Sequence, residues 1–218
     1  MFFTQVEINP QRRSSRRILG SRHYMHGAVA ATFPQSVQPG RILWRVDRQG
    51  RGTFLYMVTP LRPDLTGFVE DHGWPEVAPA KVRDYEVVLD AVTPGQKFLF
   101  RVEVNPVKNV LNVERDANTK QFPKKRGKRL AHVTPAQQLH WFASRAEGWG
   151  FALGEHRQVV RSEVLRFQKK HRPVTIASAV IEGALTVQDA ATFSERLVTG
   201  FGGARAYGCG LMTLAKPA

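Results

Sequence analysis

The order in which strand and helix patterns follow one another constrains the fold of this chain more than its composition does. The first stretch, Phe2–Ile8 (FFTQVEI), alternates apolar and polar residues, as a strand with one buried face does. Ser21 has the character of a helix N-cap, because apolar residues follow it at helical spacing from Met25 onward. Two strand patterns, a short helix and a fourth strand pattern come next, over Ile42–Val46, Thr53–Thr59, Leu65–His72 and Tyr85–Leu89. The first part of the chain therefore has the order β-α-β-β-α-β.

The same order recurs in the second part, without strong sequence identity to the first. Its opening strand, Gln96–Val104, is followed by a polar and basic insertion over Asn105–His132. Thr134 and Pro135 mark the start of a helix that runs to Glu147. Two long strands, a helix that Thr186 caps and a closing strand complete the order, over Val159–Lys169, Val174–Leu185, Thr186–Thr199 and Tyr207–Leu214.

Two successive β-α-β-β-α-β patterns predict an α+β protein built from two tandem ferredoxin-like (RRM-like) domains. Asp90–Gly95 (DAVTPG) has the composition of a linker. We therefore expect an N-terminal domain over residues 1–90 and a C-terminal domain over residues 95–218. Hydrophobic residues make up 42% of the 218, which suffices for an ordinary core.

The charge balance indicates a polyanionic partner. Lys and Arg number 32 against 18 Asp and Glu, a formal net charge of +14. Each cation placed on a phosphate releases a condensed counterion, which drives binding to nucleic acid. Solubility and an anionic membrane surface are the alternatives. Nucleic acid is favoured, because the basic residues are spread along segments that are predicted to fold.

Several other classes of protein are excluded or disfavoured. The single cysteine, Cys209, permits no intrachain disulfide and leaves a thiolate zinc site without partners. The N-terminal apolar run is too short for a signal peptide, and no stretch approaches the roughly 20 apolar residues of a membrane span. We expect a cytoplasmic protein with no membrane partner, no metal and no other cofactor.

A cluster of glycines lies near the C-terminus, in TGFGGARAYGCGL. Its members are Gly200, Gly202, Gly203, Gly208 and Gly210. Glycine lets backbone amides approach a ligand closely, and such amides bind anions. The segment lacks the Gly-Lys-Ser/Thr of a Walker loop, and Arg205 occupies the position of the next glycine in a dinucleotide-binding pattern. The alternative is a tight helix-to-strand turn with a strand packed against another backbone.

The first helical region combines arginines with two histidines. The arginines are Arg12, Arg13, Arg16, Arg17 and Arg22. His23 and His26 are three residues apart and share a flank of the helix beside its apolar stripe. Such a group is a candidate acid/base site for phosphodiester cleavage. The alternative is that both histidines are surface residues of a basic helix. A metal site is a weak hypothesis, because no carboxylate lies near in the sequence.

Two further segments are strongly basic. A predicted hairpin carries Arg161, Arg166, Lys169, Lys170 and Arg172. It can contact a nucleic-acid groove or its phosphates, or it can be a solvated edge whose charges prevent aggregation. The insertion carries Lys120, Lys124, Lys125, Arg126, Lys128 and Arg129. It is either an arm that RNA orders or a plain disordered loop.

These segments, taken in order, resemble the CasE family, the CRISPR-associated endoribonucleases of the type I-E Cascade complex. The resemblance covers nearly the whole chain. It is carried by the opening strand with NPQRRSSRR, by Met25-His26 near a helix start, by RVEVNPVK at Arg101–Lys108 and by the C-terminal GFGGARAYGCGLMTL. The order of these strings, their spacing and the chain length together make the match specific.

The resemblance implies a fold and an activity. The fold is two tandem ferredoxin-like domains, which agrees with the order of predicted elements. The activity is metal-independent cleavage of precursor RNA at the base of the CRISPR repeat stem-loop. The 2′-OH attacks the scissile phosphate and leaves a 2′,3′-cyclic phosphate and a 5′-OH. The enzyme then stays on the mature crRNA beside the other Cascade subunits.

The resemblance also assigns roles to residues. His26 matches the catalytic histidine of the family, whereas His23 stands where the family has a tyrosine, and the adjacent Tyr24 is the third candidate catalytic residue. We hypothesise that His23 takes over part of the role of that tyrosine. The predicted RNA contacts are the helical and hairpin cations named above together with Lys108, Gly200, Gly202, Gly203 and Arg205.

Two competing functions remain open at this point. The first is a non-catalytic subunit that binds the stem-loop RNA of a ribonucleoprotein complex, in which His26 contacts phosphate. The second is a structural ribonucleoprotein component similar to a basic ribosomal protein.

Overall fold

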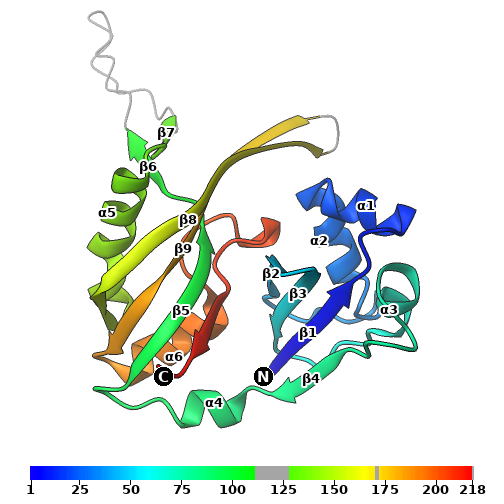
Figure 1. Cartoon of the computed structure of the whole chain (residues 1–218), viewed down its shortest axis with the longest axis horizontal. Helices are drawn as coiled ribbons and strands as arrows, with labels where there is room; N and C mark the ends of the chain where they lie inside the picture. Colours follow the sequence, from blue (N-terminus) through cyan, green and yellow to red (C-terminus); the bar gives the residue numbers. More distant parts are fainter. Residues whose placement is uncertain (111–127, 170–171, 218) are drawn as a thin grey trace, which may run out of the picture.

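The structure is a computed structural model that describes residues 1–110, 128–169 and 172–217. The chain is an α+β protein with two four-stranded antiparallel sheets, one in each part of the chain (Figure 1). A separate two-stranded sheet pairs β6 (Val107–Val110) with β7 (Lys128–Ala131). The α+β class predicted from the order of elements is thus confirmed.

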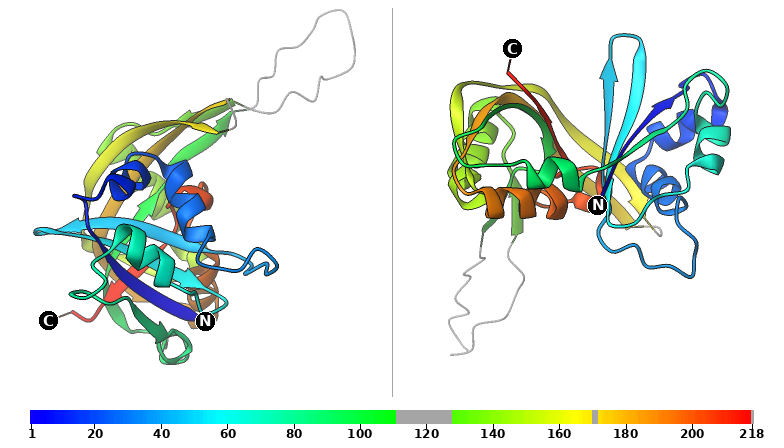
Figure 2. Two further views of the ribbon diagram at one scale, coloured as in Figure 1. Left: turned by 90° about the vertical axis from the view of Figure 1, so that its right-hand side faces the viewer. Right: turned by 90° about the horizontal axis from the view of Figure 1, so that it is seen from below.

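The first sheet has the strand order β2-β3-β1-β4. Its strands are β1 (Phe2–Ile8), β2 (Leu43–Gln49), β3 (Gly52–Thr59) and β4 (Lys81–Asp84). Helices α1 (Arg13–Leu19), α2 (Arg22–Ala30) and α3 (Thr66–His72) lie on the side that faces away from the second sheet (Figure 2). Met25 and Val29 of α2 pack there on Val6, Ile8 and Trp44. The apolar stripe predicted for α2 is therefore buried as expected.

The second sheet has the strand order β10-β5-β9-β8. Its strands are β5 (Lys97–Val104), β8 (Phe151–Lys169), β9 (Arg172–Val187) and β10 (Met212–Ala215). Helices α5 (Pro135–Ala146) and α6 (Ala190–Thr199) and the short 3₁₀ helix η1 (Glu147–Trp149) pack on one face. The predicted cap of α5 is confirmed, because Thr134 and Gln137 form a capping box.

The β8–β9 hairpin is much longer than the sheet to which it belongs. Its strands pair from Phe151 and Val187 at one end to Lys169 and Arg172 at the other. β5 pairs with β9 only over residues 179–186. The rest of the hairpin extends beyond the sheet and reaches toward α1 and α2 (Figure 1). The hairpin thus brings its basic residues near the helices of the other part of the chain.

An apolar cluster joins the two sheets. Leu43 and Val58 of the first sheet belong to the same buried cluster as Val102, Phe201 and Leu211 of the second part. Burying one such side chain stabilises a fold by roughly 1.5–3 kcal/mol. The relative position of the two sheets is therefore set by core packing.

Several predicted elements differ in the structure, among them β8, which begins at Phe151 instead of Val159. Tyr85–Leu89 is not a strand: the edge strand is β4, and α4 (Glu86–Asp90) follows it. Asp84 accepts a hydrogen bond from the backbone N–H of Glu86 at 2.9 Å, which favours a helical start. Val87 remains 70% exposed, so the alternation in YEVVL does not mark a buried face. A short apolar run of this kind fits one helical turn as well as a strand.

The last helix and the last strand also begin later than predicted. Thr186 pairs with Lys97 inside β9, and Asp189 caps α6 by accepting a hydrogen bond from Thr192 at 3.0 Å. The closing strand is Met212–Ala215, whereas Arg205–Tyr207 forms a 3₁₀ turn, η2. Before the helix, Thr186 is followed by a second residue that can cap, Asp189, and the pairing of Thr186 with Lys97 leaves Asp189 as the cap.

Parts of the basic segments lie outside the described residues. These are Lys120, Lys124, Lys125 and Arg126 of the insertion and Lys170 of the hairpin. Lys128 and Arg129 lie in β7. Across the residues that the structure describes, no helix is long and apolar enough to cross a membrane.

Candidate active site

Helix α2 carries the two histidines. Met25 and Val29 are each 1% exposed and anchor the helix on the first sheet. His26 follows Met25 and is half-buried at the edge of this contact, whereas Tyr24 is 46% exposed. The helix therefore holds His26 at the boundary between core and solvent, where a side chain can be oriented and still reach a ligand.

Residues from two distant segments of the chain meet His26. The ring of Tyr207, in η2 of the glycine-rich segment, lies edge-on to the His26 ring with centroids 6.4 Å apart. Phe167 of β8 packs on Tyr207 with ring centroids 4.9 Å apart. Lys169 of β8 places its Nζ 5.8 Å from the Tyr207 ring centroid. A helix, a 3₁₀ turn and a hairpin strand thus form one site around His26.

The backbone of η2 is held in an unusual conformation. Ala204, which precedes the turn, has φ 56°, and among the described residues it is the only residue other than glycine with positive φ. Gly208, which ends the turn, has φ 86°. A left-handed alanine is strained and persists only where its surroundings fix it. The turn that presents Tyr207 to His26 is therefore built by tertiary packing.

The surroundings of His26 favour its neutral form. Partial burial lowers its pKa from the ordinary histidine value, and the positive charges of Lys169 and His23 lower the pKa further. A histidine with a lowered pKa is neutral at physiological pH, so its free ring nitrogen can accept a proton. The site thus offers a base together with a nearby cation.

The other two predicted catalytic residues lie differently. His23 is half-buried, and its Nδ1 is buried without a hydrogen-bond partner among the described residues. Tyr24 packs beside His23, with ring centroids 5.9 Å apart, and the guanidinium of Arg17 lies 4.4 Å from the centre of the Tyr24 ring. His23 is close enough to affect the charge of His26, whereas Tyr24 faces α1.

The predicted RNA-binding cations differ in exposure and in the partners that they have within the protein. Most are exposed on α1, on β6 or on the extended hairpin: Arg13, Arg16, Arg17, Lys108, Arg166, Lys169 and Arg172. Arg12 is half-buried and donates to the backbone carbonyl of Glu70. Arg22 and Arg161 instead face Glu103, a buried carboxylate of β5. Those two arginines already have an anionic partner within the protein.

The glycine-rich segment is explained largely by packing. A Cβ on Gly208 would collide with Arg22 and would come within 2.7 Å of the Trp44 ring, and a Cβ on Gly200 would lie 2.8 Å from Leu43. Arg205 donates from Nε to the carbonyl of Gly202 at 2.9 Å, within the segment. Gly203 differs, because it is exposed and the nearest atom to its Cβ position is 4.0 Å away. Contact with RNA stays a prediction for this segment.

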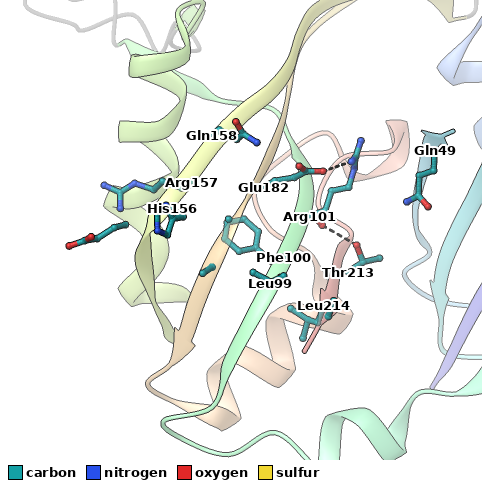
Figure 3. Close-up of a pocket in the computed structure, with 14 residues that line it drawn as sticks. Gln49, Leu99, Phe100, Arg101, His156, Arg157, Gln158, Glu182, Thr213 and Leu214 are labelled. Atoms are coloured by element: carbon teal, nitrogen blue, oxygen red, sulfur yellow. Dashed lines mark hydrogen bonds and ion pairs between the residues drawn. The ribbon is translucent and has the colours of Figure 1, made fainter. Parts of the chain in front are cut away.

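A large pocket lies away from His26. This pocket of about 690 Å³ is bounded by β5, β8, β9, β10 and Gln49 (Figure 3). Arg101, which points into it, is paired with Glu182. None of the predicted site residues lines this pocket. Sequence reasoning placed the candidate site at His26 and missed Tyr207 and Phe167, because no local motif signals a contact between such distant segments.

The fold and the site define a basic α+β protein with a half-buried histidine beside an extended cationic hairpin. A family model for CRISPR associated proteins matches residues 1–216, so the chain belongs to the CRISPR-associated Cse3/CasE family. The chain is a homologue of the CRISPR-associated endoribonuclease Cse3 of Thermus thermophilus. The two are 28% identical over 231 residues, which cover 99% of this chain and 100% of that protein.

A further relative and a solved structure agree with this assignment. The chain is 26% identical to the Cascade subunit CasE of Escherichia coli over 121 residues, 56% of this chain and 59% of that protein. The solved structure of Thermus thermophilus Cse3, bound to an RNA that represents a pre-cleavage complex, is similar with a TM-score of 0.77. It shares 28% identity, and the match covers 98% of each chain.

Proposed function

We propose that this protein is an endoribonuclease that binds the CRISPR repeat stem-loop of a precursor RNA, cleaves it and remains on the mature crRNA as a Cascade subunit. The observation that carries the proposal is His26, held half-buried with a lowered pKa between η2 and the cationic hairpin. The relationship to Cse3, which has been solved bound to RNA, supports the same conclusion.

The proposed reaction uses the 2′-OH of the RNA as nucleophile. Neutral His26 accepts the proton of the 2′-OH, whose oxygen attacks the scissile phosphorus. The bond to the 5′-oxygen of the next nucleotide breaks, and that oxygen takes up a proton to leave a 5′-OH beside a 2′,3′-cyclic phosphate. A positioned base supplies about 10²–10⁴-fold in rate. The mechanism requires no metal, because the proton transfers and the alignment of the 2′-OH come from the protein and the bound stem.

The proposed RNA-binding surface consists of the cations that have no buried partner. On α1 these are Arg13, Arg16 and Arg17, and on the hairpin they are Arg166, Lys169 and Arg172. The hairpin reaches toward α1 and α2, so phosphates bound along it are led toward His26 (Figure 1). Cations of this kind position a nucleic-acid backbone without reading its sequence. Arg22 and Arg161 are left out, because they are engaged with Glu103.

We also infer that each sheet with its helices is a ferredoxin-like domain, over residues 1–90 and 95–218. When the strands of each part are numbered from one to four, both sheets have the order 4-1-3-2: β4-β1-β3-β2 and β10-β5-β9-β8. That order follows from two β-α-β units that pack side by side, with the helices on a single face.

The experiment that tests the proposed function is cleavage of repeat RNA in the presence of EDTA. We expect one cut per RNA, a 2′,3′-cyclic phosphate on the product and no cleavage when a 2′-deoxynucleotide precedes the scissile phosphate. Tight binding without product would support the non-catalytic subunit instead. Binding that is indifferent to the stem-loop would support a structural ribonucleoprotein component.

The role of His23 is tested in the same assay. If His23 acts with His26 in proton transfer, His23→Ala lowers the single-turnover rate while RNA affinity is retained. Tyr24→Phe serves as the control, because its ring stays packed under Arg17. Cleavage by His23→Ala at the rate of the unmodified protein would show that His23 takes no part in the proton transfer.

A further inference from the structure

One fully buried carboxylate, Glu103 of β5, connects the two basic elements near the candidate active site. Glu103 is 0% exposed. Its Oε1 accepts hydrogen bonds from Arg22 Nη2 and from Ser178 Oγ, each at 2.5 Å. Its Oε2 lies 3.5 Å from Nη2 of Arg161. Arg22 is the first residue of α2 and Arg161 lies in β8, so the carboxylate ties the candidate catalytic helix to the cationic hairpin.

The path that Arg22 takes to Glu103 is enclosed on several sides. Its guanidinium lies 5.6 Å from the centre of the Trp44 ring. On the other side it passes Gly208, where any Cβ would collide with it. Gly210 donates its backbone N–H to the backbone carbonyl of Glu103 at 2.6 Å. The glycine-rich segment therefore closes over the pair and leaves Arg22 room to reach the carboxylate.

Arg22 and His26 are four residues apart, so they are neighbours on the same face of α2. A displacement of Arg22 consequently moves the start of the helix that carries His26. The same glycine-rich segment carries Tyr207, which touches His26. Glu103 thus contacts two of the three elements that form the site, α2 and β8, and its backbone is bonded to the glycine-rich segment that carries the third, η2.

We propose that Glu103 is a positioning residue for RNA cleavage, which fixes α2 and the base of the β8–β9 hairpin in one arrangement through Arg22 and Arg161. This inference rests on the proposed function. Glu103 does not touch the RNA. It acts because a buried carboxylate holds Arg22 and Arg161 in place. Removing its charge would leave Arg22 without an anionic partner, whereas Arg161 would keep its ion pair with Glu163 at 2.6 Å, so the larger effect should pass through Arg22.

The alternative is that the Glu103 cluster merely stabilises the fold, and the protein contains a matched control. Asp47 of β2 is also 0% exposed and is paired with two arginines, Arg45 at 2.7 Å and Arg101 at 3.5 Å. Arg45 likewise bridges the sheets by donating to the backbone carbonyl of Arg101 in β5 at 2.6 Å. In the described part of the chain, Arg45 and Asp47 form no hydrogen bond or ion pair with α2.

The test compares Glu103→Gln with Asp47→Asn in the full-length protein. Each change removes one buried charge and keeps the shape of the side chain. At saturating repeat RNA, we expect Glu103→Gln to lower the single-turnover rate by roughly tenfold to a hundredfold, since a misplacement of about 1 Å costs up to about 10²-fold. Asp47→Asn should cleave at nearly the normal rate after allowance for any loss of folded protein. Equal losses in both variants, or a normal rate in Glu103→Gln, would overturn the proposal.

A double-mutant cycle tests whether the effect passes through Arg22. If Arg22→Gln and Glu103→Gln act on the same contact, the double variant cleaves no more slowly than the worse single variant. If the rate losses of the two single variants multiply in the double variant, Glu103 acts on cleavage by a route that does not pass through Arg22. Should Glu103→Gln fold poorly, Ser178→Ala provides a milder change, because it removes one hydrogen bond from Oε1 and leaves the ion pair. It should then lower the rate by a smaller factor.

Hydrogen exchange separates this inference from the proposed function. In the free protein, loss of the Glu103 charge should lower the protection of the backbone amides of α2 and leave those of α5 and α6 unchanged. Unaltered protection in α2 would count against a positioning role even if cleavage fell. A protein that never cleaves repeat RNA would refute the proposed function, whereas the exchange result would still show whether Glu103 orders α2.

Discussion

Two regions lie where the N-terminal and C-terminal parts of the chain meet: a large pocket and the surroundings of His26. They differ in their balance of charge. The pocket bounded by β5, β8, β9 and β10 is large, and the charge of Arg101 beside it is balanced by Glu182 and Asp47. His26 is half-buried at the edge of α2, and its neighbours Lys169 and His23 add positive charge. An RNA strand is a long polyanion, so it requires an extended surface of unbalanced cations more than an enclosed volume. The unbalanced positive charge around His26 therefore favours this region as the proposed active site.

Replacing one histidine in each region tests this comparison most directly. His26→Ala removes the proposed base, and we expect the single-turnover rate to fall by about 10²–10⁴-fold. His156→Ala removes an exposed histidine that lines the large pocket, and the rate should not change. The measurement is single-turnover cleavage at saturating RNA. A large loss in His156→Ala with a normal rate in His26→Ala would reverse the assignment of the two regions.

The contrast between the regions also marks what can be predicted from the sequence. Local signals were sufficient for β1, whose alternation runs over its full length, and for α5, whose capping box is local. They failed at Tyr85–Leu89, where a short apolar run fits either a strand or a helical turn and the neighbouring strand already forms the edge.

The candidate site was predictable to a smaller extent. His26 stood out through its spacing from the buried stripe and through the family resemblance. Its contact with Tyr207 depends on how the glycine-rich segment crosses the first sheet, and no local pattern contains that information. Likewise, every arginine of a basic cluster looks equivalent in sequence. Arg22 and Arg161 are distinguished only because folding buries Glu103 between them.

The contribution of Tyr207 is the next test, with a smaller expected effect. Its ring borders His26 and is supported by Phe167, so Tyr207→Ala should free the imidazole and lower the cleavage rate by about tenfold. Tyr207→Phe keeps the ring and should retain most of the rate. Leu99→Ala, at the large pocket, is the control that should have no effect. If Tyr207→Phe is as slow as Tyr207→Ala, the hydroxyl and not the ring edge is what matters.

The smallest expected effect is a shift in the pH dependence of cleavage. Because the neutral form of His26 is the proposed base, the rate should rise with pH through the pKa of His26 and then level off. Burial, Lys169 and His23 all lower that pKa, so the midpoint should lie below the ordinary histidine value of 6.5. Lys169→Gln removes one of the positive charges, which raises the pKa of His26 and moves the midpoint upward. Arg157→Gln removes a cation at the large pocket instead and should leave the midpoint in place. The measurement is the single-turnover rate against pH at saturating RNA and constant ionic strength, and a midpoint that Lys169→Gln does not move would show that the hairpin cation does not act on His26 in the RNA complex.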